Sequence, residues 1–506
     1  MEIYEFSATD VAKMIKEKKI TATQVVEKLV ERIENIDDKV GAYVSYDKDK
    51  ALKLAKKLDD IPSLSSLHGV PVALKDNIVS YKDKTTASSQ MLANYVGTYD
   101  ATVVSRMRKA GIIPFGKANM DEFAMGSSTE TSFVKKTSNP FDLDRIPGGS
   151  SGGSAAMVAS REAFIALGSD TGGSVRQPAS LCGVVGLKPT YGRVSRYGLM
   201  AFGSSLDQIG ILARNSKDVA SLLEIIAGYD ELDPTTANVE VSQYTKTLDR
   251  DIKGLVIGLP KEYYSDQLDD EVRGKIEEAK IELEKLGATF KEISLPHTQY
   301  AIATYYIISS AEAASNLARY DGVRYGLRTS NESVEDMYVK SRSKGFGTEV
   351  KRRIMIGNYV LCSGFYDAYY KRASQIRRLI KEDFENVFKQ VDLILTPTSP
   401  VVASKKGEKI QDPITMYLSD IYTVCINLAG LPAISVPTKF IGKLPVGMQL
   451  IGNYFKEDLL LNVANVYEKV RGEIKYELWV CNRIGSTCTI KNKIKNMVQC
   501  RCKLWW

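Results

Sequence analysis

The sequence of 506 residues is long enough to bury a large core, and 44% hydrophobic with 25% charged residues is the composition of a soluble globular protein. It contains no run of about 18 apolar residues that could cross a membrane, and it begins with an acidic stretch where a signal peptide would be apolar, so we expect a cytoplasmic protein. Six of the seven net positive charges come from residues 479–506, which hold six basic and no acidic residues. The first 478 residues carry 62 basic and 61 acidic side chains and lack the positive charge of a nucleic-acid-binding protein.

The first elements in chain order are two helices with clear N-terminal signals. Ser7 is followed by Asp10 before an apolar periodic run, and Thr21 with Gln24 makes a capping box before a helical stripe of valine, leucine and isoleucine. Residues 70–74 then predict a short buried strand that ends at Lys75. Further along, the sequence predicts a helix over 101–110 and strands over 112–115 and 163–167.

From about residue 216 to residue 392 the chain becomes rich in helix signals and charge. This region predicts a strand over 255–259 and helices over 269–286, 312–319 and 349–388. Strand-like runs return at 393–395, 433–436 and 446–451. Alternating strands and helices favour an α/β architecture. We therefore expect one domain over residues 1–478 with a helical insertion at about 216–392.

Two clusters of glycine and serine stand out, GGSSGGS at 148–154 and DTGGS at 170–174. The first cluster runs into a helix start within the domain, which argues against a linker, and no lysine with serine or threonine follows as in a phosphate-binding loop. It also matches the nucleophile elbow G-x-S-x-G at Ser150 and at Ser151, which would need a histidine such as His297.

Taken together, the cluster at 148–154, the run DTGGSVRQPA at 170–179 and Lys75 within GVPVALKDN resemble the amidase signature family. The resemblance extends from about residue 7 to about residue 471. It implies a three-layer α/β/α fold with a large mixed central sheet. It further implies that Ser174 is the nucleophile, Ser150 a serine that follows a cis peptide bond, and Lys75 the base.

The same resemblance implies an oxyanion hole made by the amides of Thr171, Gly172, Gly173 and Ser174. It assigns supporting hydrogen bonds to Ser151, Asp170 and Arg176. The chemistry is coherent, because a serine needs a base to become a nucleophile, and a lysine is a base only when burial lowers its pKa by several units. Lys75, at the end of an apolar strand, is suitably placed for burial.

Four further stretches, at 118–132, 318–326, 346–357 and 419–432, resemble the A subunits of tRNA-dependent amidotransferases within this family. This resemblance implies that the amide is that of free glutamine. The implied glutamine contacts are Arg353 for the α-carboxylate, Asp420 for the α-amino group, Tyr305 as a third contact, and Met125, Gly126 and Ser127 beside the pocket. The sequence leaves open whether Arg352 replaces Arg353, whether Tyr306 replaces Tyr305, and whether Asp420 only caps a helix.

By the same resemblance, the chain would form a heterotrimer with B and C subunits and would itself hold no cofactor. The B subunit would bind ATP and Mg²⁺, bind mischarged Glu-tRNA(Gln) or Asp-tRNA(Asn), and receive the ammonia. The alternative is a stand-alone amidase that hydrolyses a small carboxamide with the same Lys75, Ser150 and Ser174 and has no need of Arg353 or Asp420.

The last stretch, residues 479–506, differs from the rest in composition. It holds all three tryptophans and four of the seven cysteines, and these cysteines do not have the paired spacing of zinc sites. We expect this tail to lie outside the fold, as an appendage or as translation past the natural stop.

Overall fold

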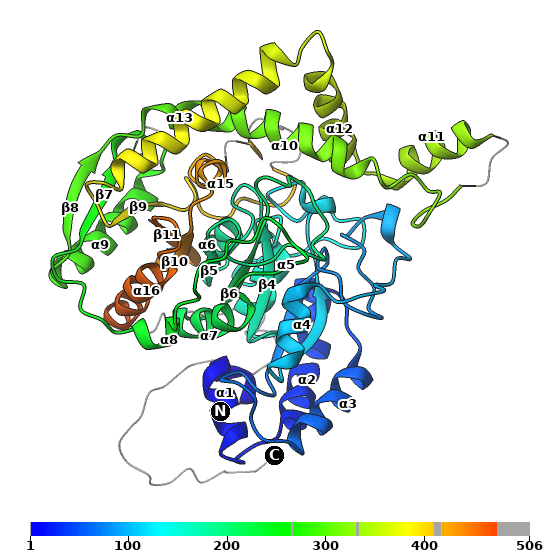
Figure 1. Cartoon of the computed structure of the whole chain (residues 1–506). Coiled ribbons are helices and arrows are strands. Elements are labelled where there is room, and N and C mark those ends of the chain that lie inside the picture. Colours follow the sequence, from blue (N-terminus) through cyan, green and yellow to red (C-terminus); the bar gives the residue numbers. More distant parts are fainter. Residues whose placement is uncertain (1, 265–266, 330–332, 409–415, 418, 473–506) are drawn as a thin grey trace, which may run out of the picture.

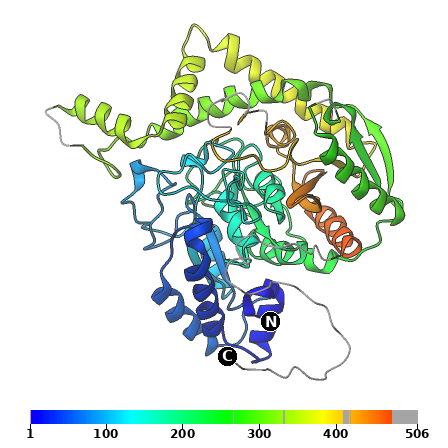
Figure 2. The ribbon, with the colours of Figure 1, turned by 180° about the vertical axis from the view of Figure 1, so that it is seen from behind.

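The computed structural model describes residues 2–264, 267–329, 333–408, 416–417 and 419–472. The predicted tail at 479–506 lies outside the described residues. The described residues form one sheet of eleven strands in the order β1-β3-β2-β4-β6-β5-β10-β11-β9-β7-β8. Helices cover the sheet on both sides (Figure 1; Figure 2 shows the opposite side). The expected α/β fold with a large mixed sheet is confirmed.

The strands are short, and six of the eleven (β2, β4, β5, β6, β9 and β11) are buried along their whole length. They are β1 (Tyr43–Ser45), β2 (Pro71–Lys75), β3 (Ile113–Ala118), β4 (Ile165–Asp170), β5 (Val185–Lys188), β6 (Gln208–Ala213), β7 (Val256–Pro260), β8 (Thr289–Ile293), β9 (Leu393–Pro397), β10 (Ala433–Ile441) and β11 (Leu444–Gly452). At one end of the sheet β2 pairs in parallel with both β3 and β4, and at the other end β7 pairs in parallel with β8 and β9. The strands between them pair antiparallel.

The helices before β4 include the two that the capping signals predict. They are α1 (Ala8–Lys16), α2 (Ala22–Val40), α3 (Lys48–Asp59), α4 (Thr102–Lys109) and α5 (Gly152–Ala159), with single turns η1 (Ile3–Glu5), η2 (Gln90–Leu92) and η3 (Glu122–Ala124). Ser7 accepts from the amide of Asp10 at the start of α1, and Thr21 and Gln24 make the full capping box of α2. Both predicted helices are confirmed.

The remaining helices build the outer layers. They are α6 (Arg176–Leu181), α7 (Ser216–Ile226), α8 (Tyr244–Thr247), α9 (Asp270–Lys285), α10 (Ala301–Leu317), α11 (Val334–Gly345), α12 (Thr348–Leu361), α13 (Arg372–Val387), α15 (Val424–Ala429) and α16 (Glu457–Arg471), with turns η4 (Lys261–Tyr263), η5 (Pro296–Tyr300) and η6 (Asp367–Lys371). One side of the sheet is covered by α4, α7, α16 and α9, and the other by α5 and α6. Above α6 lie α15, α10 and α13, and α11 projects from that side (Figure 1).

The region 216–392 contains the predicted helices together with β7 and β8, which belong to the same sheet as the rest of the chain. The predicted helix over 349–388 is interrupted: α12 ends at Leu361, Cys362 is extended, and the chain passes through η6 before α13. None of the helices in the described ranges combines the length and the apolar character that a membrane-spanning segment needs.

Candidate active site

Lys75 is the last residue of β2 and is completely buried. Its Nζ donates to Ser150 Oγ at 2.7 Å, to Ser169 Oγ at 2.9 Å and to the Ser169 carbonyl at 3.2 Å. Because β2 and β4 are adjacent and parallel, with Leu74 opposite Leu167, their carboxyl ends meet, and Lys75 comes to lie against Ser169. A protonated lysine therefore has a partner for each of its three hydrogens.

Burial lowers the pKa of Lys75 to about 7, against the opposing attraction of the buried carboxylates of Asp121, Asp170 and Asp207. An amine with that pKa is present in both its neutral and its charged form near pH 7. This side chain can accept a proton from the hydroxyl of Ser150 and give it back without a histidine.

Ser150 lies just before α5, and the Gly149–Ser150 peptide bond is cis, as the resemblance implies. The amide of Asp121 donates to the Ser150 carbonyl at 3.2 Å. A Cβ on Gly149 would lie 2.1 Å from Asp121 Oδ2, so only glycine fits between that carboxylate and the serine. Asp121 thus lies directly against the segment that presents Ser150.

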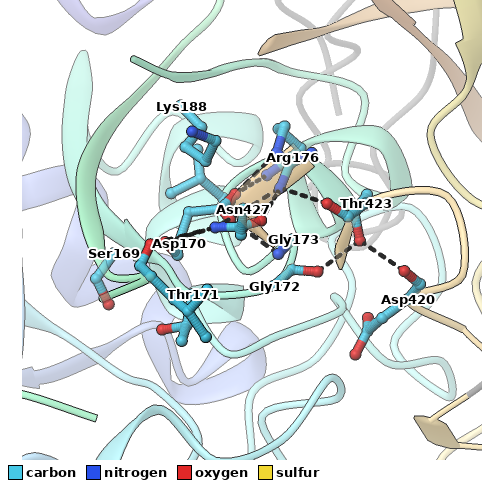
Figure 3. A network of polar contacts seen from close by, with 12 residues as sticks. Ser169, Asp170, Thr171, Gly172, Gly173, Arg176, Lys188, Asp420, Thr423 and Asn427 are labelled. Carbon is cyan, nitrogen blue, oxygen red and sulfur yellow. Dashed lines mark hydrogen bonds and ion pairs between the residues drawn. The ribbon is translucent and has the colours of Figure 1, made fainter. Parts of the chain in front are cut away.

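The second glycine-serine cluster is a loop between β4 and α6, and Asp170 at the end of β4 organises it (Figure 3). Asp170 Oδ1 accepts from the amide of Gly173 at 2.8 Å, and Oδ2 accepts from that of Val175 at 3.1 Å. Asn427 of α15 donates to Oδ1 at 3.0 Å. This buried carboxylate therefore fixes the backbone on both sides of Ser174.

Arg176 is fully buried and pairs with Asp170 through two hydrogen bonds, of 3.0 and 2.9 Å. Its Nη1 donates to Gln449 Oε1 at 2.7 Å. Its Nη2 also donates to Asn427 Oδ1 at 2.6 Å (Figure 3). Burial alone would raise the pKa of Asp170, but the Arg176 guanidinium holds that pKa well below its usual value. The carboxylate of this pair is therefore ionised at neutral pH.

Ser174 is 8% exposed, and its carbonyl accepts from the amide of Ser151 at 3.1 Å. A hydrogen bond between Ser174 Oγ and Ser150 Oγ is not among the contacts of the described residues, and such catalytic contacts often tighten only when substrate binds. The Gly173 amide donates to Asp170 and so differs from the other three amides implied for the oxyanion hole, those of Thr171, Gly172 and Ser174, which have no hydrogen-bond acceptor among the described residues. Ser151 supports the loop by accepting from the Ser169 amide at 3.3 Å.

Gly173 has a φ of +133°, and a Cβ there would lie 2.2 Å from Thr423 Oγ1. That hydroxyl donates to the Gly172 carbonyl at 2.6 Å (Figure 3). This hydrogen bond connects the loop to the start of α15. Thr423, not Asp420, is the N-cap of α15. The carbonyl of Asp420 accepts from the amides of Thr423 and Val424 at 3.0 and 3.1 Å, so the backbone of Asp420 also supports the start of α15.

Arg353, on α12, is 2% exposed and lies over two aromatic rings, with its guanidinium carbon 4.4 Å from the centre of Tyr306 and 5.1 Å from that of Tyr417. Its Nε donates to Glu349 Oε1 at 2.7 Å. Nη1 is buried and has no hydrogen-bond partner among the described residues. By contrast, the side chain of Arg352 is 39% exposed and pairs with the other oxygen of Glu349.

The other residues implied to contact glutamine lie around Arg353. Tyr305 of α10 is buried, and its ring lies so close to Gly172 that a Cβ there would be 2.6 Å from the ring carbon bearing the hydroxyl. Burial raises the pKa of the Tyr305 hydroxyl well above its usual value; the charge of Arg353 lowers this pKa, and the charge of Asp420 raises it. Ser127, which follows Met125 and Gly126, is within 3.2 Å of Ser419 Oγ, next to Asp420.

The two histidines lie elsewhere. His297 Nδ1 pairs with Asp383 of α13 at 2.9 Å, and His68 is buried with Nε2 3.1 Å from the Leu58 carbonyl. Ser150 is instead bonded to Lys75. The structure therefore does not assemble a nucleophile elbow with His297.

Several residues of this site were not singled out in the sequence. Ser169 takes two of the three hydrogen bonds of Lys75, and Asp207 accepts from Thr171 Oγ1 at 2.6 Å. Asn427 and Thr423 reach the loop from α15. Ser169 precedes the DTGGS run directly and could have been found from it, whereas the contacts from α15 depend on a pairing across more than 200 residues.

In a comparison with known protein families, residues 24–461 match the family described as Amidase. Since this match covers most of the sequence, the chain belongs to the amidase family, as its signature residues indicate.

Individual relatives within the amidase family have more specific names. A protein of Carboxydothermus hydrogenoformans, named as the A subunit of glutamyl-tRNA(Gln) amidotransferase, is 56% identical over 474 residues, which is 93% of this chain and 98% of the relative. The crystal structure of a protein of the same name from Thermotoga maritima is 44% identical, with a TM-score of 0.78 over 93% of this chain and 95% of that one. The structure of a 6-aminohexanoate cyclic dimer hydrolase is 26% identical, with a TM-score of 0.82 over 95% of this chain and 100% of that one.

Proposed function

We propose that this chain is the glutamine-hydrolysing A subunit of a tRNA-dependent amidotransferase. The observation that carries the proposal is Arg353, a buried guanidinium whose Nη1 has no partner among the described residues. Its charge acts on Tyr305, the side chain that lies against Gly172 of the Ser174 loop. A buried donor without a partner is costly, and a carboxylate is the ligand that satisfies a guanidinium best. The relatives with the amidotransferase name support the same assignment.

In this mechanism neutral Lys75 accepts the proton of Ser150 while Ser150 accepts that of Ser174. Ser174 Oγ attacks the carboxamide carbon of glutamine and forms a tetrahedral oxyanion. As the carbon–nitrogen bond breaks, the proton returns through Ser150 to the leaving nitrogen, and ammonia departs. A water molecule, deprotonated by the same path, then splits the acyl-enzyme into glutamate and free Ser174.

The oxyanion would be stabilised by amides of the loop that Asp170 holds rigid. The Gly173 amide already donates to Asp170, so the proposed donors to the oxyanion are the amides of Thr171, Gly172 and Ser174. Donors fixed in advance stabilise developing charge without the cost of reorienting, and one such donor contributes about 3 kcal/mol. Arg176, paired to Asp170, keeps this loop in place.

Glutamine would be held at both charged groups of its backbone. Arg353 would bind the α-carboxylate through Nη1, Asp420 would attract the α-amino group, and Tyr305 would line the pocket above Gly172. Met125, Gly126 and Ser127 would form the wall on the side of the loop after η3. Of the two alternatives left open by the sequence, this proposal takes Arg353 over Arg352, because Arg352 is exposed at the surface.

The ammonia would pass to a B subunit that holds mischarged Glu-tRNA(Gln) or Asp-tRNA(Asn) with ATP and Mg²⁺, in a cytoplasmic heterotrimer with a small C subunit. In the described residues no three or more His, Cys, Asp or Glu side chains gather as metal ligands would. The body of the chain is close to neutral, which suits a protein that does not grip tRNA itself.

The test is ammonia release from glutamine by the full chain, alone and together with candidate B and C subunits, mischarged tRNA and ATP. We expect weak release by the chain alone and strong stimulation in the complete assembly. Absence of stimulation, together with rapid hydrolysis of a hydrophobic amide, would identify a stand-alone amidase and contradict the proposal.

A paired substitution tests the glutamine contact directly. Arg353→Lys keeps the charge but loses the planar donor pair, so the KM for glutamine should rise about ten-fold or more. Arg352→Lys, one residue away and exposed, is the matched control and should leave KM unchanged. Equal effects of the two substitutions would remove Arg353 from the glutamine site.

A further inference from the structure

Asp121 and Glu122 are adjacent buried carboxylates that face two different parts of the site. Asp121 lies against the Ser150 segment: its amide donates to the Ser150 carbonyl, and its side chain accepts from the amides of Ser128 and Thr129. Glu122 instead faces the first turn of α12. One dipeptide therefore contacts both the catalytic serine and the helix that carries Arg353.

Glu122 holds the N-terminus of α12 with one oxygen and η2 with the other. Oε2 accepts from the amide of Gly347, the N-cap of α12, at 2.8 Å. Oε1 accepts from Ser89 Oγ at 2.5 Å, and Ser89 also donates to the Gly345 carbonyl at 3.3 Å. Gly347 leaves room for this carboxylate, because a Cβ there would lie 2.3 Å from Oε2.

A second contact runs alongside. The rings of Phe123 and Phe346 meet edge to face with centres 5.6 Å apart. Phe123 and Ala124 both have positive φ, 49° and 63°, which non-glycine residues adopt only when their surroundings fix them. The amide of Phe123 is held by the Ala87 carbonyl at 3.0 Å. The backbone after Glu122 is thus set in one uncommon conformation against α12.

The position of α12 matters because its first two turns form the carboxylate end of the proposed glutamine site. Glu349, in the first turn, orients Arg353 in the next, and Tyr417 Oη donates to the same Glu349 oxygen at 3.2 Å. An α-helix moves as a rigid rod over this length, so a shift at Gly347 is carried to Arg353. A carboxylate at a helix N-terminus also interacts favourably with the helix dipole.

We infer that Glu122 is a positioning residue for glutamine: it fastens the loop that bears Asp121 to the N-terminus of α12 and so fixes Arg353 relative to Ser150 and Ser174. This inference rests on the proposed function, because it assumes that Arg353 binds the glutamine carboxylate. It assigns Glu122 a part in affinity and none in the proton transfers. Burial also raises the pKa of Glu122 to about 7, against the hydrogen bonds from Ser89 and Gly347, so this contact has its full strength above pH 7.

The test compares glutamine with 4-aminobutanamide, which has the same carboxamide and amine but no α-carboxylate. Glu122→Ala in the full assembly should raise the KM for glutamine about ten-fold while kcat changes less than about three-fold. For 4-aminobutanamide kcat/KM should stay within about two-fold of wild type, because Arg353 has nothing to bind. Glu122→Gln can still accept from Gly347 and meet Ser89, so it should restore most of the affinity for glutamine.

Gly347→Ala disturbs the same contact from the other side and serves where Glu122→Ala does not fold. The three atoms nearest to its methyl group all belong to the Glu122 carboxylate, so it should raise the KM for glutamine in the same way. Glu335 is an exposed carboxylate in the first turn of α11. The substitution Glu335→Gln is the matched control and should leave kcat and KM unchanged for both substrates.

Unchanged KM for glutamine in both Glu122→Ala and Gly347→Ala would overturn the inference while leaving the proposed function intact. An equal loss with 4-aminobutanamide would also overturn it, since that pattern marks a general structural role. If wild type released no ammonia from glutamine, the proposed function would fail, and this inference with it.

Discussion

At the scale of single residues, the chemistry depends on how Lys75 is kept partly neutral. The lysine is enclosed at the end of β2, and burial outweighs the attraction of three buried carboxylates. Ser150 and Ser169 supply the hydrogen bonds that the charged form needs. The balance leaves a base with a pKa of about 7, and a general base is most effective when its pKa is close to the pH of the reaction.

The pH dependence of the reaction follows from that pKa. Lys75 is a base only without its proton, so kcat/KM for glutamine should rise about ten-fold per pH unit below pH 7 and level off above it. Lys75→Ala should lower kcat by about 10³-fold. Steady-state rates between pH 5 and 9 check both expectations.

Lys188 provides a control for this assignment. Burial lowers its pKa to about 7 as well, but its Nζ donates to the Pro189 carbonyl. Lys188→Gln should therefore keep the same pH midpoint for glutamine hydrolysis. A midpoint that moves with Lys188 and not with Lys75 would show that the wrong lysine has been taken as the base.

The sequence predicts which residues belong to the site better than it predicts which other residues they contact. Lys75, Ser150, Asp170 and Ser174 lie in two short glycine-serine runs and at one strand end, and the structure brings all four to the same place. Asp207 and Glu349 carry no such local signal. Their contacts arise only after distant segments pack, as with Tyr417, which donates to Glu349 from 68 residues away.

At the scale of elements, the loop from Asp170 to Arg176 is fixed by hydrogen bonds and an ion pair to the Asp170 carboxylate. Three backbone amides and the Arg176 guanidinium all donate to the Asp170 carboxylate. Helix α15 adds Thr423 and Asn427 from the outside (Figure 3). The loop is rigid because each of these polar groups at its base is paired.

Asp170→Asn tests this arrangement. It removes the negative partner of a buried arginine, so the free energy of unfolding should fall by about 3–5 kcal/mol. Hydrolysis of glutamine should fall about 10²-fold, because the loop amides lose their alignment. Urea denaturation and steady-state kinetics measure the two effects.

The matched control is Asp367→Asn. Asp367 also pairs with a cation, Lys371 at 3.1 Å, but its side chain is 79% exposed. An exposed pair of this kind contributes less than about 1 kcal/mol, so stability and activity should hardly change. If both substitutions had the same small effect, burial would not be what makes the Asp170 pair important.

Elements with strong local signals were predicted, and those defined by distant partners were not. The capping residues located α1 and α2, and apolar runs located β2, β9 and β11. Strand β8, an edge strand with mostly exposed side chains, lacks an apolar run and was missed. The sequence predicts one continuous helix where the structure has α12 and α13, because Gly364 is almost the only residue between them that disfavours a helix.

At the scale of the whole molecule, one sheet unites the two ends of the chain. Strands β10 and β11 come late in the sequence but insert between β5 and β9, and α16 then packs on them. The strand order cannot be read from local patterns, because each of these pairings joins segments that are far apart. The last helix of the described residues is α16, which ends at Arg471.

The unusual composition of residues 479–506 leads to a prediction about the tail. A chain that stops after Leu478 should unfold within about 2 °C of the full chain and hydrolyse glutamine at the same rate within its assembly. Calorimetry and ammonia release measure the two properties. Loss of either would show that residues 479–506 belong to the fold, against our expectation.

A chain that stops after Lys456 is the contrasting case. It lacks α16, whose buried residues include Leu460, Leu461, Val463 and Tyr467. At about 2 kcal/mol for each buried apolar side chain, their loss amounts to about 8 kcal/mol, comparable with the entire stability of a typical domain. This shorter chain should fail to fold, because the face of β10 and β11 that α16 covers would be left open to water.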